Sequence, residues 1–264
     1  MKTEFLTLDA IEAFDRDGYI VIEHLLDAEE TELLGTIARR DHAFAAARTS
    51  RADGEGGSVD LVVENELPSD SIYSAIVQAE PLASAMESLL GDEVYHYHHK
   101  MILKEPRVGG AWTWHQDYGY WYNNGCLLPD MASCMFAVDR ATRENGCLQV
   151  LRGSHRMGRI DHIKRGDQTG ADLERVSAAL ERMELVHVQM TPGSAVIFHG
   201  NTLHRSDQNL SENPRWAFIC CYNTRSNSPY KRGRHPLYSP MMRVPAAEVA
   251  SIGRLHLQSL LVKN

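Results

Sequence analysis

The run VYHYHHKMIL, residues 94–103, marks the point at which the character of the chain changes. It is rich in aromatic and β-branched residues, which favour strands. Further strand-like runs, each bounded by turn residues, follow at 133–138, 147–151, 185–190, 195–198 and 216–222. One helical segment interrupts them at 171–183, where apolar residues recur at helical spacing. Residues 91–225 are therefore predicted to form a mostly antiparallel β core.

The residues before this core have mainly helical patterns. Apolar spacing and capping residues predict a short strand at 18–22 and helices at 8–17, 28–39, 69–78 and 81–90. The run TSRADGEGGSVD, residues 49–60, has almost no apolar content and is predicted to be a mobile loop. We therefore expect residues 1–90 to form a mainly helical flank of the later sheet.

The residues after the core are rich in Arg, Ser, Asn and Pro between 223 and 240. That composition predicts an irregular tail over 226–264, and whether this tail covers a pocket at the edge of the sheet stays open. A chain of 264 residues can bury a large core without disulfides, and it shows no internal repeat. We expect a single domain over 1–264.

Composition and charge exclude two classes of partner. Apolar residues make up 43% of the chain, but no apolar run approaches the roughly 18 residues that would span a membrane. The net charge is −8, so the chain lacks the phosphate attraction on which nucleic-acid binders depend. We expect neither a membrane nor a nucleic acid as partner.

The cysteines and the first residues point to the cytoplasm. The five cysteines are too few and too irregularly spaced for a disulfide framework, and none forms a C-x-x-C motif. Residues 1–10 mix charged and apolar side chains, which is unlike a signal peptide. Thirteen histidines in an acidic chain are the remaining oddity, and several lie in tight groups.

The most distinctive of these groups is WHQD, residues 114–117. On an extended segment, residues two apart project to the same side, so His115 and Asp117 would present an imidazole and a carboxylate together. Two histidines and one carboxylate, with open positions opposite them, suit a non-haem Fe(II) oxygenase. An isolated H-x-D also arises by chance, so this prediction needs a second histidine from elsewhere.

His204 is the best candidate for that second histidine. It follows PGSAVIF, residues 192–198, which is typical of a turn leading into a buried strand. Arg215 lies downstream, and an arginine can hold a carboxylate through two parallel hydrogen bonds. The cluster His96, His98, His99 lacks the aspartate of a metallo-β-lactamase site and is more typical of alternating strand positions.

Several short runs, taken together, carry a family resemblance. They are HQD at 115–117, NGCL at 145–148 with GSH at 153–155, HRS at 204–206 with Arg215, and FDRDGYIVI at 14–22. With these runs the chain resembles the phytanoyl-CoA dioxygenase family from about residue 8 to about residue 225. Members of that family are Fe(II)- and 2-oxoglutarate-dependent oxygenases on a double-stranded β-helix, a cupin-like jelly roll, and they include ectoine hydroxylase.

The resemblance implies a set of metal ligands and a reaction. His115, Asp117 and His204 would bind Fe(II), and His199 is a weaker alternative because the downstream pattern follows His204. Related halogenases have Gly or Ala in place of the carboxylate, so Asp117 favours hydroxylation. The expected reaction consumes O2 and 2-oxoglutarate, hydroxylates an unactivated C–H bond of a small molecule, and releases succinate and CO2.

The resemblance also implies how the cosubstrate is held. Arg215 would grip the distal carboxylate of 2-oxoglutarate, and Ser206 would donate to the same group. His99 matches the place where ectoine hydroxylase uses a glutamine toward the cosubstrate. Whether His99 or its neighbour Lys100 holds 2-oxoglutarate stays open.

Large aromatic residues surround the H-x-D motif. Tyr118, Tyr120 and Trp121 follow it, and Trp114 precedes His115. Since pockets are commonly lined by aromatic side chains, we expect one or two of these four to contact the substrate.

The sequence leaves two alternative functions open. A cupin-like isomerase, hydrolase or ligand-binding protein would use the same metal ligands without 2-oxoglutarate, and Arg215 is the residue that discriminates. An inert scaffold would not need the complete ligand set. The identity of the substrate and the oligomeric state are left open.

Overall fold

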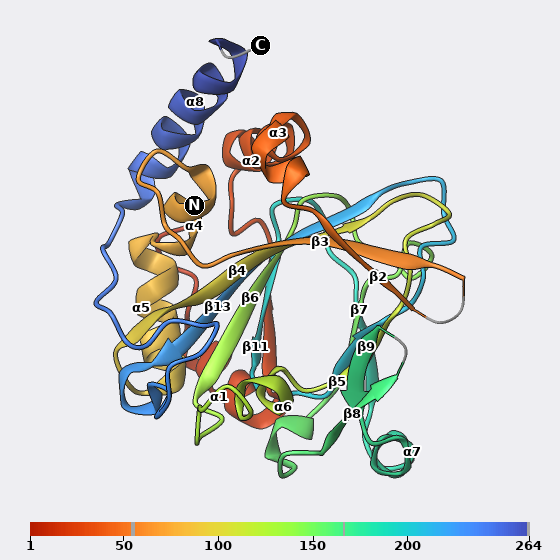
Figure 1. Cartoon of the computed structure of the whole chain (residues 1–264). Helices are drawn as coiled ribbons and strands as arrows, with labels where there is room; N and C mark the ends of the chain where they lie inside the picture. The colour runs from red at the N-terminus through yellow and green to blue at the C-terminus, as the bar shows by residue number, and fades with distance from the viewer. Residues whose placement is uncertain (54–55, 166, 263–264) are drawn as a thin grey trace.

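The computed structural model describes residues 1–53, 56–165 and 167–262, and most of its strands belong to two antiparallel sheets (Figure 1). The strands of the larger sheet are β1 (Tyr19–Ile22), β2 (Thr49–Ala52), β3 (Ser58–Glu64), β4 (Val94–Lys104), β6 (Met131–Ala137), β11 (Ala195–His199) and β13 (Arg215–Thr224). They are arranged in the order β1-β11-β6-β13-β4-β3-β2. Each described pairing between them is antiparallel.

The smaller sheet lies across from the larger one and carries shorter strands. They are β5 (Trp112–His115), β7 (Leu148–Leu151), β10 (Leu185–Val188) and β12 (His204–Ser206), in the order β10-β7-β12-β5. A separate hairpin is formed by β8 (His162–Arg165) and β9 (Gln168–Ala171). The expectation of a mostly antiparallel core is confirmed.

Helices cover the outer face of the larger sheet (Figure 1). They are α1 (Leu8–Asp17), α2 (Ala28–Arg40), α4 (Ile72–Val77) and α5 (Glu80–Leu90), with α8 (Ala246–Val262) packed on α2 and α4. The short helices are α3 (His42–Ala46), α6 (Asp117–Trp121) and α7 (Leu173–Leu180). The layered arrangement is thus helices, larger sheet, smaller sheet.

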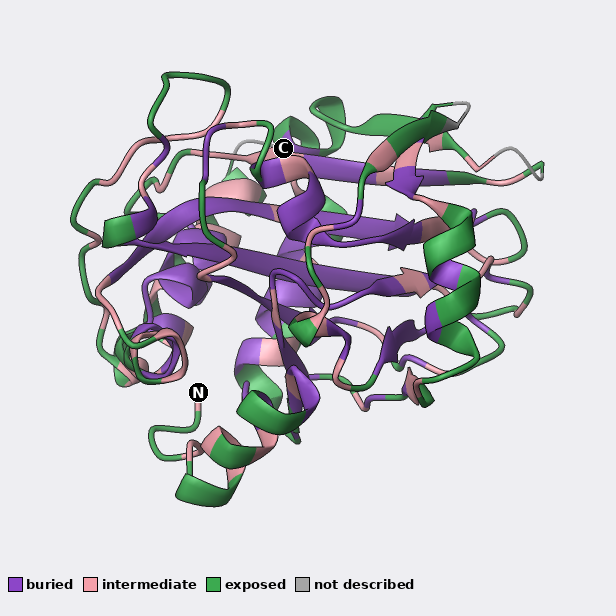
Figure 2. Cartoon of the chain, turned by 90° about the horizontal axis from the view of Figure 1, so that it is seen from below, coloured by how far each residue is buried: buried purple, intermediate pink, exposed green. Residues whose placement is uncertain are grey.

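Strand alternation creates two cores, one on each face of the larger sheet. Along β4, Met101 and Leu103 belong to the core under the helices, whereas Ile102 belongs to the core between the sheets. Successive side chains of a strand point to opposite faces, so a strand buried on both faces has no polar side. Figure 2 shows this, because the long strands of the larger sheet are buried along their length.

Two expectations about the flanks are wrong. Residues 49–60 are not a loop, because β2 and β3 pair there and β3 continues the sheet beside β4. The glycines of this run belong to the connection between the two strands, of which residues 54 and 55 lie outside the described residues. The apolar side chains Val59 and Leu61 are buried between the sheets, which makes this segment a strand.

The carboxy-terminal segment 226–264 is also only partly irregular. Residues 228–243 have little regular structure, but 246–262 form α8, and residues 263 and 264 lie outside the described part. Val249 is fully buried in the helix-side core, and a Cβ at Gly253 would lie 2.9 Å from Ile72. Close packing on α4 therefore stabilises a helix that composition alone did not reveal.

Within the described residues, no helix is long and apolar enough to cross a membrane.

Candidate active site

Three buried side chains from two regions of the chain converge between the sheets. His115 ends β5, Asp117 begins α6 and His204 begins β12. One possible ligand atom from each lies within 4.8 Å of the others. The Nε2 of His115 is 3.8 Å from Oδ1 of Asp117, and the two imidazole ring centroids are 4.0 Å apart. The structure therefore brings together the three residues expected to bind metal.

A β-bulge, not simple alternation, sets the direction of His115. His204 is opposite His115 and Ser206 is opposite Trp112, so β5 has one extra residue in this interval. A bulge of this kind re-aims a side chain. It places Trp112 and His115 on the wall of the same cavity although they are three residues apart.

The expectation that His115 and Asp117 share one extended segment is also wrong. The strand ends at His115, Gln116 is extended with φ −108°, and Asp117 is the first residue of α6. The carboxylate thus reaches the site from the first turn of a helix. The H-x-D spacing does bring the imidazole and the carboxylate together, but it does so at a junction between a strand and a helix and not along one strand.

Hydrogen bonds leave one ligand atom of each group available. In both histidines Nδ1 lies 2.8 Å from the carbonyl oxygen two residues earlier, in Thr113 and Thr202 respectively. These carbonyls accept the Nδ1 protons and leave Nε2 directed at the site. The Oγ of Ser133 on β6 donates to Oδ2 of Asp117 at 2.9 Å, so Oδ1 remains for a metal.

The electrostatics of the site suit a divalent cation. Burial lowers the pKa of His115 well below its ordinary value, and the neighbouring His204 adds to this effect. Burial likewise lowers the pKa of His204. Neutral imidazoles are the form that binds a metal, and two imidazoles with one carboxylate are the donor set of non-haem Fe(II) oxygenases. The residues present fit an iron ion.

The triad lies on the wall of a cavity that also contains a buried arginine. Arg215, at the start of β13, is only 3% exposed, and burial lowers its pKa to about 10, so it is charged at neutral pH. Its Nη2 donates to the carbonyl of Gly146 at 2.7 Å. Its Nε is buried and has no hydrogen-bond partner among the described residues. A buried guanidinium with a free donor is suited to an anionic group.

Two more of the expected cosubstrate residues face the same cavity. Ser206 on β12 and Lys100 on β4 both line it, together with Arg205. The rest of the wall is mainly apolar and comprises Ile102, Met135, Leu148, Phe198 and Ile219. The cavity therefore combines a metal-binding corner, cationic groups and a dry wall.

His99 faces the opposite side of the sheet from the cavity that Lys100 lines, so of these two candidates the structure places only Lys100 beside Arg215 and Ser206. The ring of His99 lies against Tyr73 of α4 and Phe218 of β13, and its Nδ1 is 3.1 Å from Nε2 of His96. Strand alternation explains this, because Lys100, the next residue, must then face the cavity.

The four aromatic residues proposed for the substrate pocket are not among the residues that line this cavity. Tyr118 donates to the carbonyl of Leu127 at 2.5 Å, and Tyr120 donates to that of Thr169. Trp114 belongs to a small core beside α7. Tyr120 is nearer to the site, since its ring centroid lies 5.5 Å from that of His115. Trp112 lines the cavity instead.

The fully buried Gln116, between the two ligands of the H-x-D motif, connects the site to two loops. Its backbone N–H donates to Nε2 of His162 at 3.0 Å, and its Oε1 accepts from the backbone of Ile160 at 2.7 Å. Its side-chain amide donates to the carbonyls of Asn201 at 3.0 Å and Gly158 at 3.3 Å. Sequence reasoning missed this role, because a glutamine at the middle position of H-x-D has no signal of its own.

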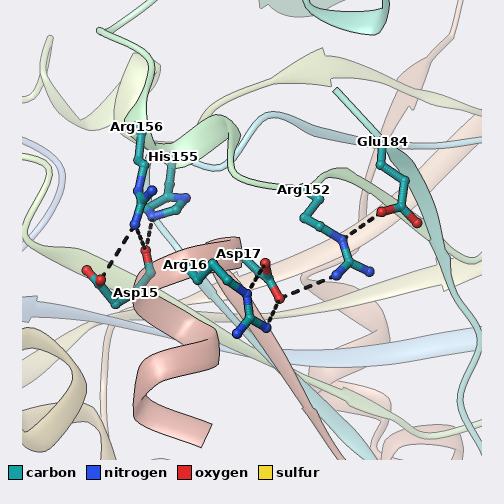
Figure 3. Close-up of polar contacts among 7 residues, drawn as sticks. All are labelled: Asp15, Arg16, Asp17, Arg152, His155, Arg156 and Glu184. Atoms are coloured by element: carbon teal, nitrogen blue, oxygen red, sulfur yellow. Dashed lines mark hydrogen bonds and ion pairs between the residues drawn. The ribbon is translucent and has the colours of Figure 1, made fainter. Parts of the chain in front are cut away.

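The GSH run at 153–155 links α1 to the loop before His204. Figure 3 shows Asp15 and Asp17 at the end of α1 facing the basic residues of the 152–156 segment. His155 Nε2 lies 2.9 Å from the carbonyl of Asp15, and Arg152 is 3.5 Å from Asp17. The Oγ of Ser154 accepts from the backbone N–H of Leu203 at 2.9 Å. This part of the family pattern is therefore structural.

His199, the alternative metal ligand, contacts the loop before His204. Its Nδ1 accepts from the backbone N–H of Asn201 at 3.0 Å, and its ring lies 5.6 Å from that of His155. It is not one of the three converging ligands.

Comparison with known proteins agrees with this site. A model of the family described as phytanoyl-CoA dioxygenase matches residues 14–217. L-proline trans-4-hydroxylase from Streptomyces griseoviridis is 29% identical over 254 residues, which cover 89% of this chain and 91% of that protein. Ectoine dioxygenase from Sphingopyxis alaskensis is 31% identical over 232 residues, which cover 81% of this chain and 75% of that protein.

A solved structure extends the agreement to the fold. EctD from S. alaskensis with bound Fe superimposes with a TM-score of 0.77 and 25% identity, covering 91% of this chain and 88% of that one. The expected jelly roll is thereby confirmed. The family model spans most of the chain and includes the three converging ligands and Arg215. The chain therefore belongs to the phytanoyl-CoA dioxygenase family.

Proposed function

We propose that this chain is an Fe(II)- and 2-oxoglutarate-dependent dioxygenase that hydroxylates an unactivated C–H bond of a small molecule. One observation carries the proposal most directly. Three ligand atoms within 4.8 Å of one another share a cavity wall with a buried arginine that has an unused Nε–H. A metal-binding protein without an anionic cosubstrate has no need for this arginine.

The metal ligands have distinct supports. His115 and His204 hold iron through Nε2, because backbone carbonyls occupy both Nδ1 protons. Asp117 binds through the oxygen that Ser133 leaves free. When bound, iron and 2-oxoglutarate supply the oxidising power, so that one atom of O2 enters the substrate C–H bond and the other enters succinate, with loss of CO2.

Cationic groups of the cavity hold the cosubstrate in this proposal. Arg215 binds the distal carboxylate of 2-oxoglutarate, and the hydroxyl of Ser206 donates to the same group. Lys100 faces the same cavity from β4 and attracts the dicarboxylate. The apolar side chains of the wall exclude water, which strengthens these contacts.

The substrate is a small molecule. Two of the relatives named above act on L-proline and on ectoine according to their names, and both compounds are compact. We also propose that the protein works in the cytoplasm without a nucleic-acid partner. The five buried free cysteines and the net charge of −8 support these two points.

An anaerobic titration tests the proposed function. Protein loaded with Fe(II) should develop a weak charge-transfer absorbance in the visible when 2-oxoglutarate is added, and on admission of O2 it should form succinate. Loss of the band in Arg215→Ala, but not in the surface control Arg182→Ala, would assign it to the cavity. A wild-type protein that binds iron but shows no band would contradict the use of 2-oxoglutarate and favour a cupin-like metal protein.

A further inference from the structure

Two histidines at one end of the space between the sheets belong to neither the metal ligands nor the cosubstrate residues. His98 on β4 is 5% exposed, and His235 comes from the irregular segment after β13. Their ring centroids are 4.9 Å apart, and the ring of His235 also stacks on Tyr97 at 4.6 Å. Trp121 of α6 closes the group, 5.9 Å from His98.

One ring nitrogen of each imidazole is buried without the hydrogen-bond partner that a buried polar atom normally has. The Nδ1 atoms of His98 and His235 are both inaccessible and make no hydrogen bond within the described residues. Leaving a buried polar nitrogen unsatisfied is unfavourable, and such a group calls for an explanation.

The strand register places His98 in the same cross-strand row as a residue that contacts the metal site. His98 is opposite Cys221 on β13, and Cys221 is opposite Ser133 on β6, which donates to Asp117. Because neighbouring strands are about 4.8 Å apart, His98 lies roughly 10 Å from Ser133 across the sheet. His98 is also two residues from Lys100, which lines the cavity, so a substrate that extends from the metal past Lys100 would meet these imidazoles.

The charge of this end favours an anion. Lys100 faces the same side of β4 as His98 and lines the metal cavity, and no described carboxylate forms an ion pair with it. Burial, with Arg234 and Lys100 contributing, lowers the pKa of His235 to about 4, and burial lowers that of His98 well below its ordinary value. Both rings are therefore neutral at pH 7, and each has one N–H to donate.

We propose that His98 and His235 form the substrate subsite and that the substrate is a small molecule with a carboxylate, which accepts a hydrogen bond from each imidazole beside Lys100. The inference rests on the proposed function, because it names the substrate class of the same site. Two donors and a nearby ammonium in a water-poor space match a carboxylate, and they discriminate against its neutral amide or ester.

The first arm of the test varies the ligand. Enzyme with Fe(II), 2-oxoglutarate and O2 is offered L-proline, L-pipecolate and ectoine, each beside its carboxamide, and succinate is measured. At least one carboxylate should stimulate succinate formation tenfold or more above its own carboxamide. If no carboxylate stimulates, or if the amides are as effective, the proposal is overturned.

The second arm varies the protein. His98→Phe and His235→Phe keep an aromatic ring but remove the N–H, so each should raise the KM for the active carboxylate about tenfold or more. The Fe(II)–2-oxoglutarate absorbance reports whether the metal site is still assembled in each variant. His96→Phe is the matched control, since His96 is equally buried on β4 but packs against His99 on the other face.

The outcomes separate the two proposals. A normal absorbance with an unchanged KM in both His98→Phe and His235→Phe overturns the subsite alone. If His98→Phe fails to fold, the KM of His235→Phe tests the subsite, because His235 lies on an irregular segment outside the sheets and its substitution is expected to leave the fold intact. Absence of the absorbance in the wild-type protein overturns the proposed function and this inference with it.

Discussion

At the scale of single residues, one local arrangement orients three imidazoles around the site. In His115, His162 and His204, Nδ1 lies 2.8 Å from the carbonyl oxygen of the residue two positions earlier. This contact selects the tautomer that keeps its proton on Nδ1. What Nε2 then meets differs, since it faces the metal site in two cases and accepts the backbone N–H of Gln116 in the third.

Arg215 should decide cosubstrate affinity. Arg215→Ala should raise the KM for 2-oxoglutarate by about 100-fold, because a charge-assisted pair contributes about 1.5–3 kcal/mol. Arg215→Lys keeps the charge but loses the planar fork, so a rise of about tenfold is expected. Steady-state kinetics at saturating iron measure both values, and wild-type KM values in the two variants would remove Arg215 from the cosubstrate site.

Gln116 should affect metal affinity without contacting the metal. Gln116→Ala removes the hydrogen bonds to residues 158, 160 and 201, so Fe(II) should bind about 10–100-fold more weakly. Gln116→Glu keeps an oxygen that accepts from Ile160 and should fall between alanine and wild type. Competition with a metal-binding dye measures the affinity, and thermal unfolding verifies the fold. Equal affinity in all three proteins would show that Gln116 does not position the ligands.

At the scale of elements, the site depends on how α6 meets the β8–β9 hairpin. Gly119 in α6 has no side chain, and a Cβ placed there would overlap the ring of His162. That ring is held at both nitrogens, by the carbonyl of Ile160 and the N–H of Gln116. It therefore cannot swing away as a flexible side chain would.

Gly119→Ala should destabilise the protein through this contact. We expect a loss of about 1–3 kcal/mol in the free energy of unfolding, because the methyl group overpacks a fixed ring. In the His162→Ala background the same substitution should have almost no effect, because the space is then empty. A double-mutant cycle from denaturant unfolding measures the coupling. Additive effects would place the strain elsewhere.

At the scale of the whole molecule, the larger sheet separates two environments. Its helix-covered face buries His96 and His99, and its other face lines the metal cavity. Burial lowers the pKa of His99 to about 4 and that of His96 to about 3. The protonation of these two histidines should therefore affect the packing of the helices on the sheet and not the reaction at the metal site.

His99 should make the fold sensitive to mild acid. The unfolded chain takes up this proton below pH 6.5, whereas the folded protein resists it down to about pH 4. The stabilising contribution of neutral His99 to the free energy of unfolding is therefore fully present above pH 6.5 and decreases as the pH falls. At pH 5 the free energy of unfolding is lower by about 2 kcal/mol because of this residue. His99→Phe should show a smaller drop in Tm between pH 7 and pH 5 than wild type. An identical drop would contradict the assignment, and the exposed His42→Phe is the control.

Sequence alone was sufficient for the local and chemical parts of this protein. Hydrophobic period, turn residues and caps located β4, β6, β11, β13 and the helices α1, α2 and α5 to within a few residues. Residue chemistry, together with the family resemblance, predicted His115, Asp117 and His204 as metal ligands, and the structure brings these three side chains together. These properties depend on short stretches of chain, so they can be deduced without knowing what packs against them.

Tertiary structure decided which face each residue occupies. A single bulge aims His115 into the cavity, strand pairing turns the polar run at 49–60 into β2 and β3, and α8 is stabilised by packing on α2 and α4. The same register turns Lys100 toward the cavity and His99 away from it. A shift of one residue reverses the face of every side chain in a strand, and nothing in a strand's own sequence records its partner's register.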